Sequence, residues 1–354
     1  MSPFALLKDV PNTALMLSIG LVGAVVAVLL GLPMPFLMGA LASVGFYAAM
    51  RTARGQSEAH FPKPLRRLFV GLIGVMIGAS FTADLLGSLP AIWPSLLAMI
   101  GFVGVALGLG YAIFRILGRY DKVTAFYSAM PGGLIEAVSL GEEAGGDVRV
   151  LALQHFARIV VVVVTVPLLY LAWTGQAVGS AGGQSFEVGT WDWFDVIELF
   201  AIAVVGMWIG PHLRFPAAHM VGPLVLSAVL HGSGMLHLSS PFWLLALAQL
   251  MVGCGLGVSF AGATLRDLMR AFGLGTVYVV VILGLSYTVA FVLSGLLPFS
   301  FDTLFVSFAP GGVTEMGLIA LSLGISPVVV TVLHVFRIAL TVAVAGILAK
   351  RLRS

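Results

Sequence analysis

The sequence predicts an all-α polytopic membrane protein with two inverted-topology repeats, each of about five spans plus a re-entrant Pro-Gly-Gly hairpin. Three observations carry this prediction. Hydrophobic residues make up 60% of the 354 positions and charged residues 9%, whereas soluble domains carry about 25% charged residues. Apolar runs of about 20 residues, the length of a spanning helix, recur along the chain. A 35-residue segment occurs twice, 179 positions apart.

Ten apolar stretches are long enough to be spans. In the first half they cover residues 13–31, 34–50, 66–83, 91–117 and 149–173. In the second half they cover residues 194–210, 216–232, 242–262, 271–297 and 327–348. We therefore expect a first membrane repeat over residues 1–175, a linker over 176–193 and a second membrane repeat over 194–354.

The duplicated segment conserves polar residues and helix breakers within apolar sequence. Residues 124–158 align with 303–337 without a gap and share eleven identities. The shared residues that carry chemistry or break helices are Pro131/Pro310, Gly132/Gly311, Gly133/Gly312, Glu136/Glu315, His155/His334 and Arg158/Arg337. Because such residues are costly inside a membrane, their duplication marks the candidate site.

Each Pro-Gly-Gly sequence should end one short helix and begin another, since proline fits a first helical turn and lacks an N–H donor. The segment around it is then either a re-entrant hairpin or a broken spanning helix. The distribution of Lys and Arg favours the hairpin, because it places the basic residues of the short loops on one side of the membrane. With five spans per repeat, the second repeat must then insert upside down.

The same charge distribution predicts the orientation. Both chain termini and the basic loop 51–67 are expected in the cytoplasm, and the linker 176–193 in the periplasm, of a bacterial inner membrane. The formal charge of +3 comes from basic residues scattered over loops. It therefore gives no indication of a nucleic-acid partner, and the expected partners are the lipid bilayer and a small-molecule or ion ligand. The sequence leaves open a homo-oligomer.

The helix starts at the Pro-Gly-Gly breaks are candidate anion sites. A half-helix that begins at membrane depth has unpaired backbone N–H groups and a positive dipole end. Pro131, Gly132 and Gly133 in the first copy and Pro310, Gly311 and Gly312 in the second are therefore candidate substrate-binding residues. The alternative is a structural kink buried within protein.

Glu136 and Glu315 follow Pro-Gly-Gly at the same spacing. An ionisable residue in a membrane segment is by default a hypothesis for a site. These carboxylates could carry a proton, bind a coupling cation or contact substrate. They could also form structural ion pairs with Arg158 and Arg337, and the two roles can coexist.

His155 with Arg158, and His334 with Arg337, are three residues apart and share a helix face. This pattern favours anion binding or a proton relay over metal, because an arginine beside a histidine disfavours a divalent cation. We therefore expect Arg158 and Arg337 to bind substrate and the histidines to act with the glutamates in ion coupling. Two alternatives remain: these side chains anchor the hairpin through its carbonyls, or both histidines and both glutamates bind a metal.

The duplicated Pro-Gly-Gly-x-x-Glu block followed by His-x-x-Arg resembles the AbrB-type duplicated bacterial membrane protein family, over essentially the whole chain. Members of that family are labelled as ammonia monooxygenases or as regulators of gene expression. The resemblance therefore implies either a metal-dependent membrane monooxygenase or an indirect role in regulation. A regulator would act through a partner that binds an exposed cytoplasmic surface, and the basic loop 51–67 is the only candidate for that surface.

The residues themselves favour a secondary-transporter-like protein that moves a small anionic or polar solute coupled to protons or sodium. The sequence contains no ATP-binding motif of the Gly-x-x-x-x-Gly-Lys-Ser/Thr type, so the energy is expected to come from ion gradients. No catalytic residue, metal ligand or cofactor is predicted.

Overall fold

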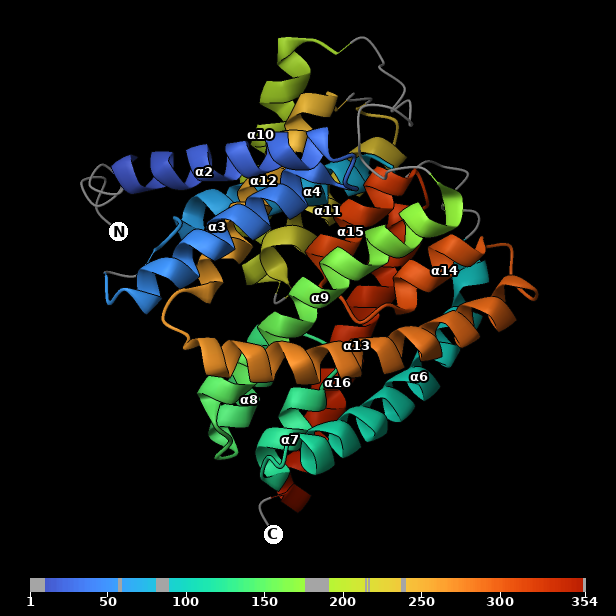
Figure 1. Cartoon of the computed structure of the whole chain (residues 1–354). Coiled ribbons are helices and arrows are strands. Elements are labelled where there is room, and N and C mark those ends of the chain that lie inside the picture. Colours follow the sequence, from blue (N-terminus) through green and yellow to red (C-terminus); the bar gives the residue numbers. More distant parts are fainter. Residues whose placement is uncertain are drawn as a thin grey trace. The chain divides into compact units, whose positions relative to one another are not determined.

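The computed structural model describes residues 10–56, 59–80, 89–175, 191–213, 215, 217–236 and 240–352. These residues form helices joined by short turns, with no strand among them (Figure 1). The all-α prediction is therefore confirmed. Most of the predicted linker 176–193, the end of the predicted span 66–83 and both chain termini lie outside the described residues.

Eight described helices are long and apolar enough to cross a membrane. They are α2 (Val10–Leu29), α3 (Pro35–Ala53), α6 with η2 (Trp93–Ala112, Ile113–Leu117), α9 (Val148–Thr174), α10 (Trp193–His212), α12 with η3 (Phe242–Gly257, Val258–Phe260), α13 (Leu265–Ser294) and α16 (Pro327–Leu352). They match eight of the ten predicted spans. The other two correspond to the shorter helices α4 (Lys63–Ala79, 17 residues) and α11 (Ala218–Gly232, 15 residues).

Residues that favour helix starts, such as proline in the first turn and aspartate at the N-cap, mark the beginnings of several helices in the sequence. Pro35, Pro64 and Pro94 lie in the first turns of α3, α4 and α6, where their missing N–H group is not needed. Asp192 caps α10 by accepting hydrogen bonds from the backbone N–H groups of Phe194 and Asp195.

The chain divides into two compact units, and each contains helices from both halves of the sequence. The first unit comprises residues 1–86, 164–265 and 321–324, and thus α2, α3, α4, α10, α11, α12 and the end of α9. The second unit comprises residues 87–163, 266–320 and 325–354, and thus α6, the start of α9, α13, α16 and the two Pro-Gly-Gly segments. The compact units therefore cut across the predicted repeats 1–175 and 194–354.

In the first unit, corresponding positions of the two sequence halves make equivalent contacts. Helices α2 and α3 touch at Gly23 and Gly39, where a Cβ atom on Gly39 would lie 2.3 Å from the Gly23 carbonyl oxygen. Helices α10 and α11 touch at Gly206 and Gly222, where the same distance would be 2.2 Å. Both pairs of positions are 183 residues apart, so each copy uses the same glycine crossing for its first two helices.

The third helix of each copy packs against the second helix of the other copy. Gly74 of α4 lies against the Met220 carbonyl of α11, and Gly253 of α12 lies against the Leu37 carbonyl of α3. In both cases a Cβ atom would lie 2.4–2.6 Å from the carbonyl oxygen, so only glycine fits. The two halves of the sequence are thereby interlocked within this unit.

The second unit contains the two Pro-Gly-Gly segments. In the first, α7 (Lys122–Ala129) and α8 (Leu134–Glu143) flank the break, and in the second, α14 (Phe301–Phe308) and α15 (Val313–Leu323) do so. The Asp147 N–H beyond α8 donates to the Thr124 hydroxyl at the start of α7, at 2.9 Å. Both ends of the first segment therefore lie next to each other.

Candidate functional site

The candidate site consists of two helix breaks in the second unit, which we call the first break (Met130–Gly133) and the second break (Ala309–Gly312). The residue before each proline has an extended ψ, 119° for Met130 and 142° for Ala309, because proline disfavours helical backbone at the preceding residue. Helix α7 therefore ends at Ala129 and α14 at Phe308. Their last carbonyl groups have no partner within their own helix.

The two repeated arginines bond to those carbonyl groups. Arg158 Nη1 donates to the Met130 oxygen at 2.5 Å. Arg337 donates from Nη1 to Ala309 and from Nη2 to Gly311, both at 2.6 Å. Both arginines are buried, and their positive charge lies at the negative end of a helix dipole. The structure thus shows the carbonyl-anchoring geometry that the sequence left as an alternative.

The two repeated glutamates turn back toward the start of their own half-helix. A Cβ atom on Gly133 would lie 2.2 Å from Oε2 of Glu136, and one on Gly312 would lie 2.1 Å from Oε2 of Glu315. Each glutamate is the third helical residue after a glycine N-cap, the position from which a carboxylate reaches back to the cap. At each helix start, a carboxylate of the protein itself therefore lies at the position predicted for a bound anion.

In the part of the chain that the structure describes, neither Arg158 nor Arg337 forms a hydrogen bond with the glutamate of its own copy. Among the described residues, the hydrogen bonds of Arg158 and Arg337 go to carbonyl oxygens and the Tyr278 hydroxyl, not to carboxylates. The physical reason is that arginine and glutamate stabilise opposite ends of the break: the arginine stabilises the carbonyl end of one half-helix, the glutamate the N–H end of the next.

The two repeated histidines differ in their partners. His155 donates from Nε2 to the Tyr127 carbonyl in the last turn of α7, at 2.9 Å. His334 instead donates from Nδ1 to the Val330 carbonyl of its own helix, also at 2.9 Å. Both side chains are fully buried. The bond of His155 therefore links α9 to the helix that ends at the first break, whereas the Val330 bond of His334 lies within α16.

Both breaks contact the same short stretch of α16. Arg337 bonds to the second break. A Cβ atom added to Gly132 of the first break would lie 3.1 Å from both Ile338 Cα and Thr341 Oγ1. Residues 337 to 341 rise by about 6 Å along a helix. Arg158 and Arg337 are also close enough for their charges to interact. The structure thus brings the repeated residues of both copies together.

Several buried polar atoms around the breaks have no hydrogen-bond partner in the part of the chain that the structure describes. They include Arg158 Nε, Arg337 Nε, His155 Nδ1 and Ser128 Oγ. An unpartnered buried polar group costs about 1–3 kcal/mol. These atoms therefore mark where a polar or anionic ligand, or water, would find hydrogen-bonding groups.

Helix α13 contributes two side chains that the sequence comparison missed. Tyr278 donates to the Ala129 carbonyl at 3.4 Å, and Ser286 donates to the Phe308 carbonyl at 3.0 Å. These are the last residues of α7 and α14. The repeat could not reveal them, because the corresponding positions on α6 are Met99 and Leu107. The available signal was a pair of polar residues eight positions apart within a long apolar helix.

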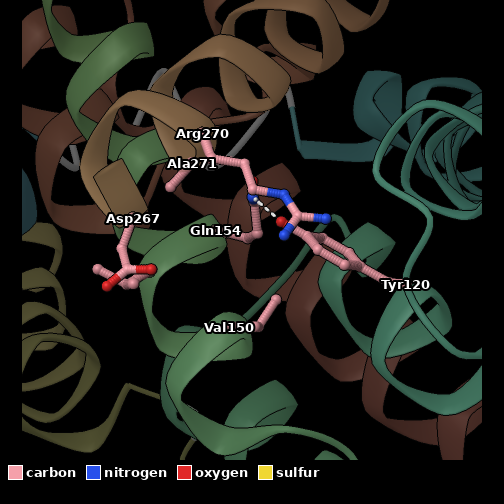
Figure 2. A pocket seen from close by; sticks show the side chains of 7 residues that line it. Tyr120, Val150, Gln154, Asp267, Arg270 and Ala271 are labelled. Atoms are coloured by element: carbon pink, nitrogen blue, oxygen red, sulfur yellow. Dashed lines mark hydrogen bonds between the residues drawn. The ribbon is translucent and has the colours of Figure 1, made fainter. Parts of the chain in front are cut away.

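A small polar pocket lies where α7 begins, next to the starts of α9 and α13 (Figure 2). Gln154 donates to the Tyr120 hydroxyl at 2.8 Å, and the Arg270 guanidinium lies 5.0 Å from the centre of the Tyr120 ring. Burial raises the pKa of Tyr120, and Gln154 and Arg270 partly offset that rise. The pocket holds about 50 Å³, enough for one or two water molecules at about 30 Å³ each.

A family model described as "Transition state regulatory protein AbrB" matches residues 43–353. An uncharacterized protein of Bacillus subtilis (strain 168), YhjN, is 25% identical over 345 residues, which cover 92% of this chain and 89% of that protein. A protein of Escherichia coli (strain K12) named "Putative regulator AbrB" is 25% identical over 257 residues, which cover 70% of this chain and 71% of that protein.

Proposed function

Since the chain belongs to the AbrB family and is an all-α polytopic membrane protein, we propose that it is a secondary transporter of a small anionic or polar solute. Its site is formed by the two helix breaks, and transport is coupled to protons or sodium. It acts in the bacterial inner membrane with both termini in the cytoplasm. No nucleic acid takes part, and association into a homo-oligomer is left open.

One observation carries this proposal. Two broken helices contact the same stretch of α16, with the buried arginines Arg158 and Arg337 beside them. Buried charges are normally paired, yet neither guanidinium bonds to a carboxylate among the described residues. Broken helices with ionisable residues are a recurrent form of solute site in secondary transporters. The positive charge and unpartnered N–H groups favour a solute with negative charge.

The two glutamates suggest how an ion would be coupled to the solute. Each carboxylate lies at a helix start, a place that also attracts an anionic solute. The glutamate and the solute therefore compete for the same backbone groups. Binding a proton or a sodium ion at Glu136 or Glu315 removes or screens the carboxylate charge. The helix start, with Gly132 and Gly133 or Gly311 and Gly312, then becomes available to the solute.

The test measures ligand-induced thermal stabilisation of the detergent-purified full chain. Small carboxylates, inorganic anions and amines are screened at several pH values, with and without sodium. We expect an anion to stabilise the wild type in a pH- or sodium-dependent way, and Glu136→Gln and Glu315→Gln to remain folded but lose that dependence. A glutamine variant that binds the same anion with unchanged pH and sodium dependence would exclude coupling by that glutamate.

The two labels that the family resemblance implies gain no support from the site. Among the described residues, no group of three or more His, Cys, Asp and Glu side chains could hold a metal ion, so no observation favours a metal-dependent monooxygenase. An indirect regulatory role would require a partner for the 51–67 loop, part of which lies outside the described residues.

A further inference from the structure

A groove on the first unit is separate from the two helix breaks. It holds about 520 Å³ and lies along α2 and α3, in the volume range of small-molecule sites. Ser43, Phe46, Met50 and Arg54 of α3 line it, together with Val22 of α2. The α3 residues recur at helical spacing and so form one continuous face. Phe46 is 71% exposed and Val22 is 64% exposed.

The groove has the length of one leaflet of a bilayer. Ser43 and Arg54 are eleven residues apart, which corresponds to a rise of about 17 Å along a helix. Half of the hydrocarbon core of a bilayer is about 15 Å thick. Because α3 is a candidate span that ends at Ala53, Arg54 follows the span directly and falls at the level of lipid headgroups.

The two arginines at this end of α3 differ in their surroundings. Arg51 donates to the Tyr47 hydroxyl at 3.2 Å and lies over the Tyr47 ring, so it holds one wall of the groove. Arg54 is exposed and lines the end of the groove. No side-chain hydrogen bond or ion pair of Arg54 forms with another described residue, so its charge is available to an outside partner.

We propose that this groove binds one anionic phospholipid, with an acyl chain along Phe46 and Val22 and the headgroup phosphate on Arg54. The inference is independent of the proposed transport function. It is also specific to the first copy: 183 positions later, the residues that correspond to Met50 and Arg54 are Ser233 and His237. His237 lies outside the described residues.

The experiment is native mass spectrometry of the delipidated full chain with dioleoyl phosphatidylglycerol or dioleoyl phosphatidylcholine. We expect one tightly bound lipid and about a fivefold preference for the anionic headgroup, as for one basic residue near an anionic surface. Arg54→Gln should abolish the preference, and Arg54→Lys should keep it. Val22→Trp should fill the groove and weaken both lipids. Arg266→Gln, which removes an exposed arginine outside the groove, should change nothing.

Three outcomes would overturn the proposal. The first is equal binding of the two lipids by the wild type. The second is an unchanged preference in Arg54→Gln, whose elution from a sizing column would show that it is folded. The third is loss of the bound lipid on addition of inorganic phosphate at millimolar concentration, which would mean that Arg54 recognises free phosphate rather than a lipid.

Discussion

The first and second breaks contain the same repeated residues, but the hydrogen bonds to their carbonyl groups come from different side chains. At the first break, Arg158 bonds to one carbonyl group and His155 to another. At the second break, Arg337 bonds to two carbonyl groups, and the Nδ1 of His334 donates to Val330 of its own helix. The repeated motif therefore determines which groups need hydrogen-bond donors, namely the carbonyl groups at the end of a helix. It does not determine which side chain donates to each of these carbonyl groups.

The breaks also differ in accessibility. Glu315 is 5% exposed, whereas Glu136 is only half-buried. Gly133 has a positive φ of 35°, whereas Gly312 is not among the glycines with positive φ. The first break is thus the more open and the more dependent on glycine, and the second is more tightly enclosed. These differences can be tested by paired substitutions, one at each break.

The largest expected effect is that of Arg337→Met. It removes two bonds to backbone carbonyls, those of Ala309 and Gly311, although the Ala309 carbonyl keeps the bond that it accepts from the Gly311 N–H. Arg158→Met removes one carbonyl bond, to Met130, and the bond to the Tyr278 hydroxyl, which still donates to Ala129. A hydrogen bond to a charged group contributes about 1.5–3 kcal/mol, and Arg337 makes one more carbonyl bond than Arg158, so we expect the larger loss of stability for Arg337→Met. Thermal unfolding of the purified variants in detergent measures both losses, with Arg266→Met as the exposed control. A larger loss for Arg158→Met would contradict the assigned bonds.

A smaller effect is expected for alanine at the second glycine of each break. Both Gly133→Ala and Gly312→Ala place a Cβ atom against a glutamate oxygen. Only Gly133→Ala also forces a residue with a side chain into left-handed backbone, which costs about 1–2 kcal/mol. Adding Glu315→Ala should therefore restore most of the stability lost by Gly312→Ala.

The matching double substitution at the first break gives the contrast. Adding Glu136→Ala to Gly133→Ala should restore only part of the lost stability, because the backbone strain remains. The coupling energies of the two double-mutant cycles are compared by thermal unfolding. Full recovery in both cycles would show that the conformation of Gly133 is not the difference between the breaks.

The smallest effect concerns the caps that begin α7 and α14. Asp121 accepts from the N–H groups of Val123 and Thr124, and Ser300 accepts from that of Thr303. Burial opposes ionisation of Asp121, but these hydrogen bonds outweigh it and hold its pKa below the ordinary value of 3.8. A lowered carboxyl pKa adds stability that is present above the unfolded pKa and lost as the pH falls through the folded value.

Asp121→Asn keeps the cap but removes the charge, because asparagine caps helices about as well as aspartate. The wild type should therefore be slightly more stable than this variant at neutral pH, and the difference should vanish as the pH falls below about 4. Ser300→Asn provides the control, since neither residue titrates in this range. A difference between wild type and Asp121→Asn that stays constant from pH 7 to pH 3 would argue against the lowered pKa.

The sequence was sufficient to identify the helical class, most of the spans and the repeated residues around the breaks. It could not show how those residues pair. A spacing of 22 residues between Glu136 and Arg158 is compatible with an ion pair, and only the fold shows that they stabilise opposite ends of a break. Tyr278 was not found because a repeat search sees only what both copies keep. The composition of the compact units depends on helix packing between positions far apart in the chain, which local patterns do not encode.

The interlocked helices of the first unit have a consequence for biosynthesis. Because α4 packs on α11 and α12 packs on α3, neither compact unit can be completed until the second half of the chain has been made. During translation, α3 and α4 are therefore made before α12 and α11, the helices against which they pack. A half-length ancestor could have met the same need only by pairing with another copy of itself.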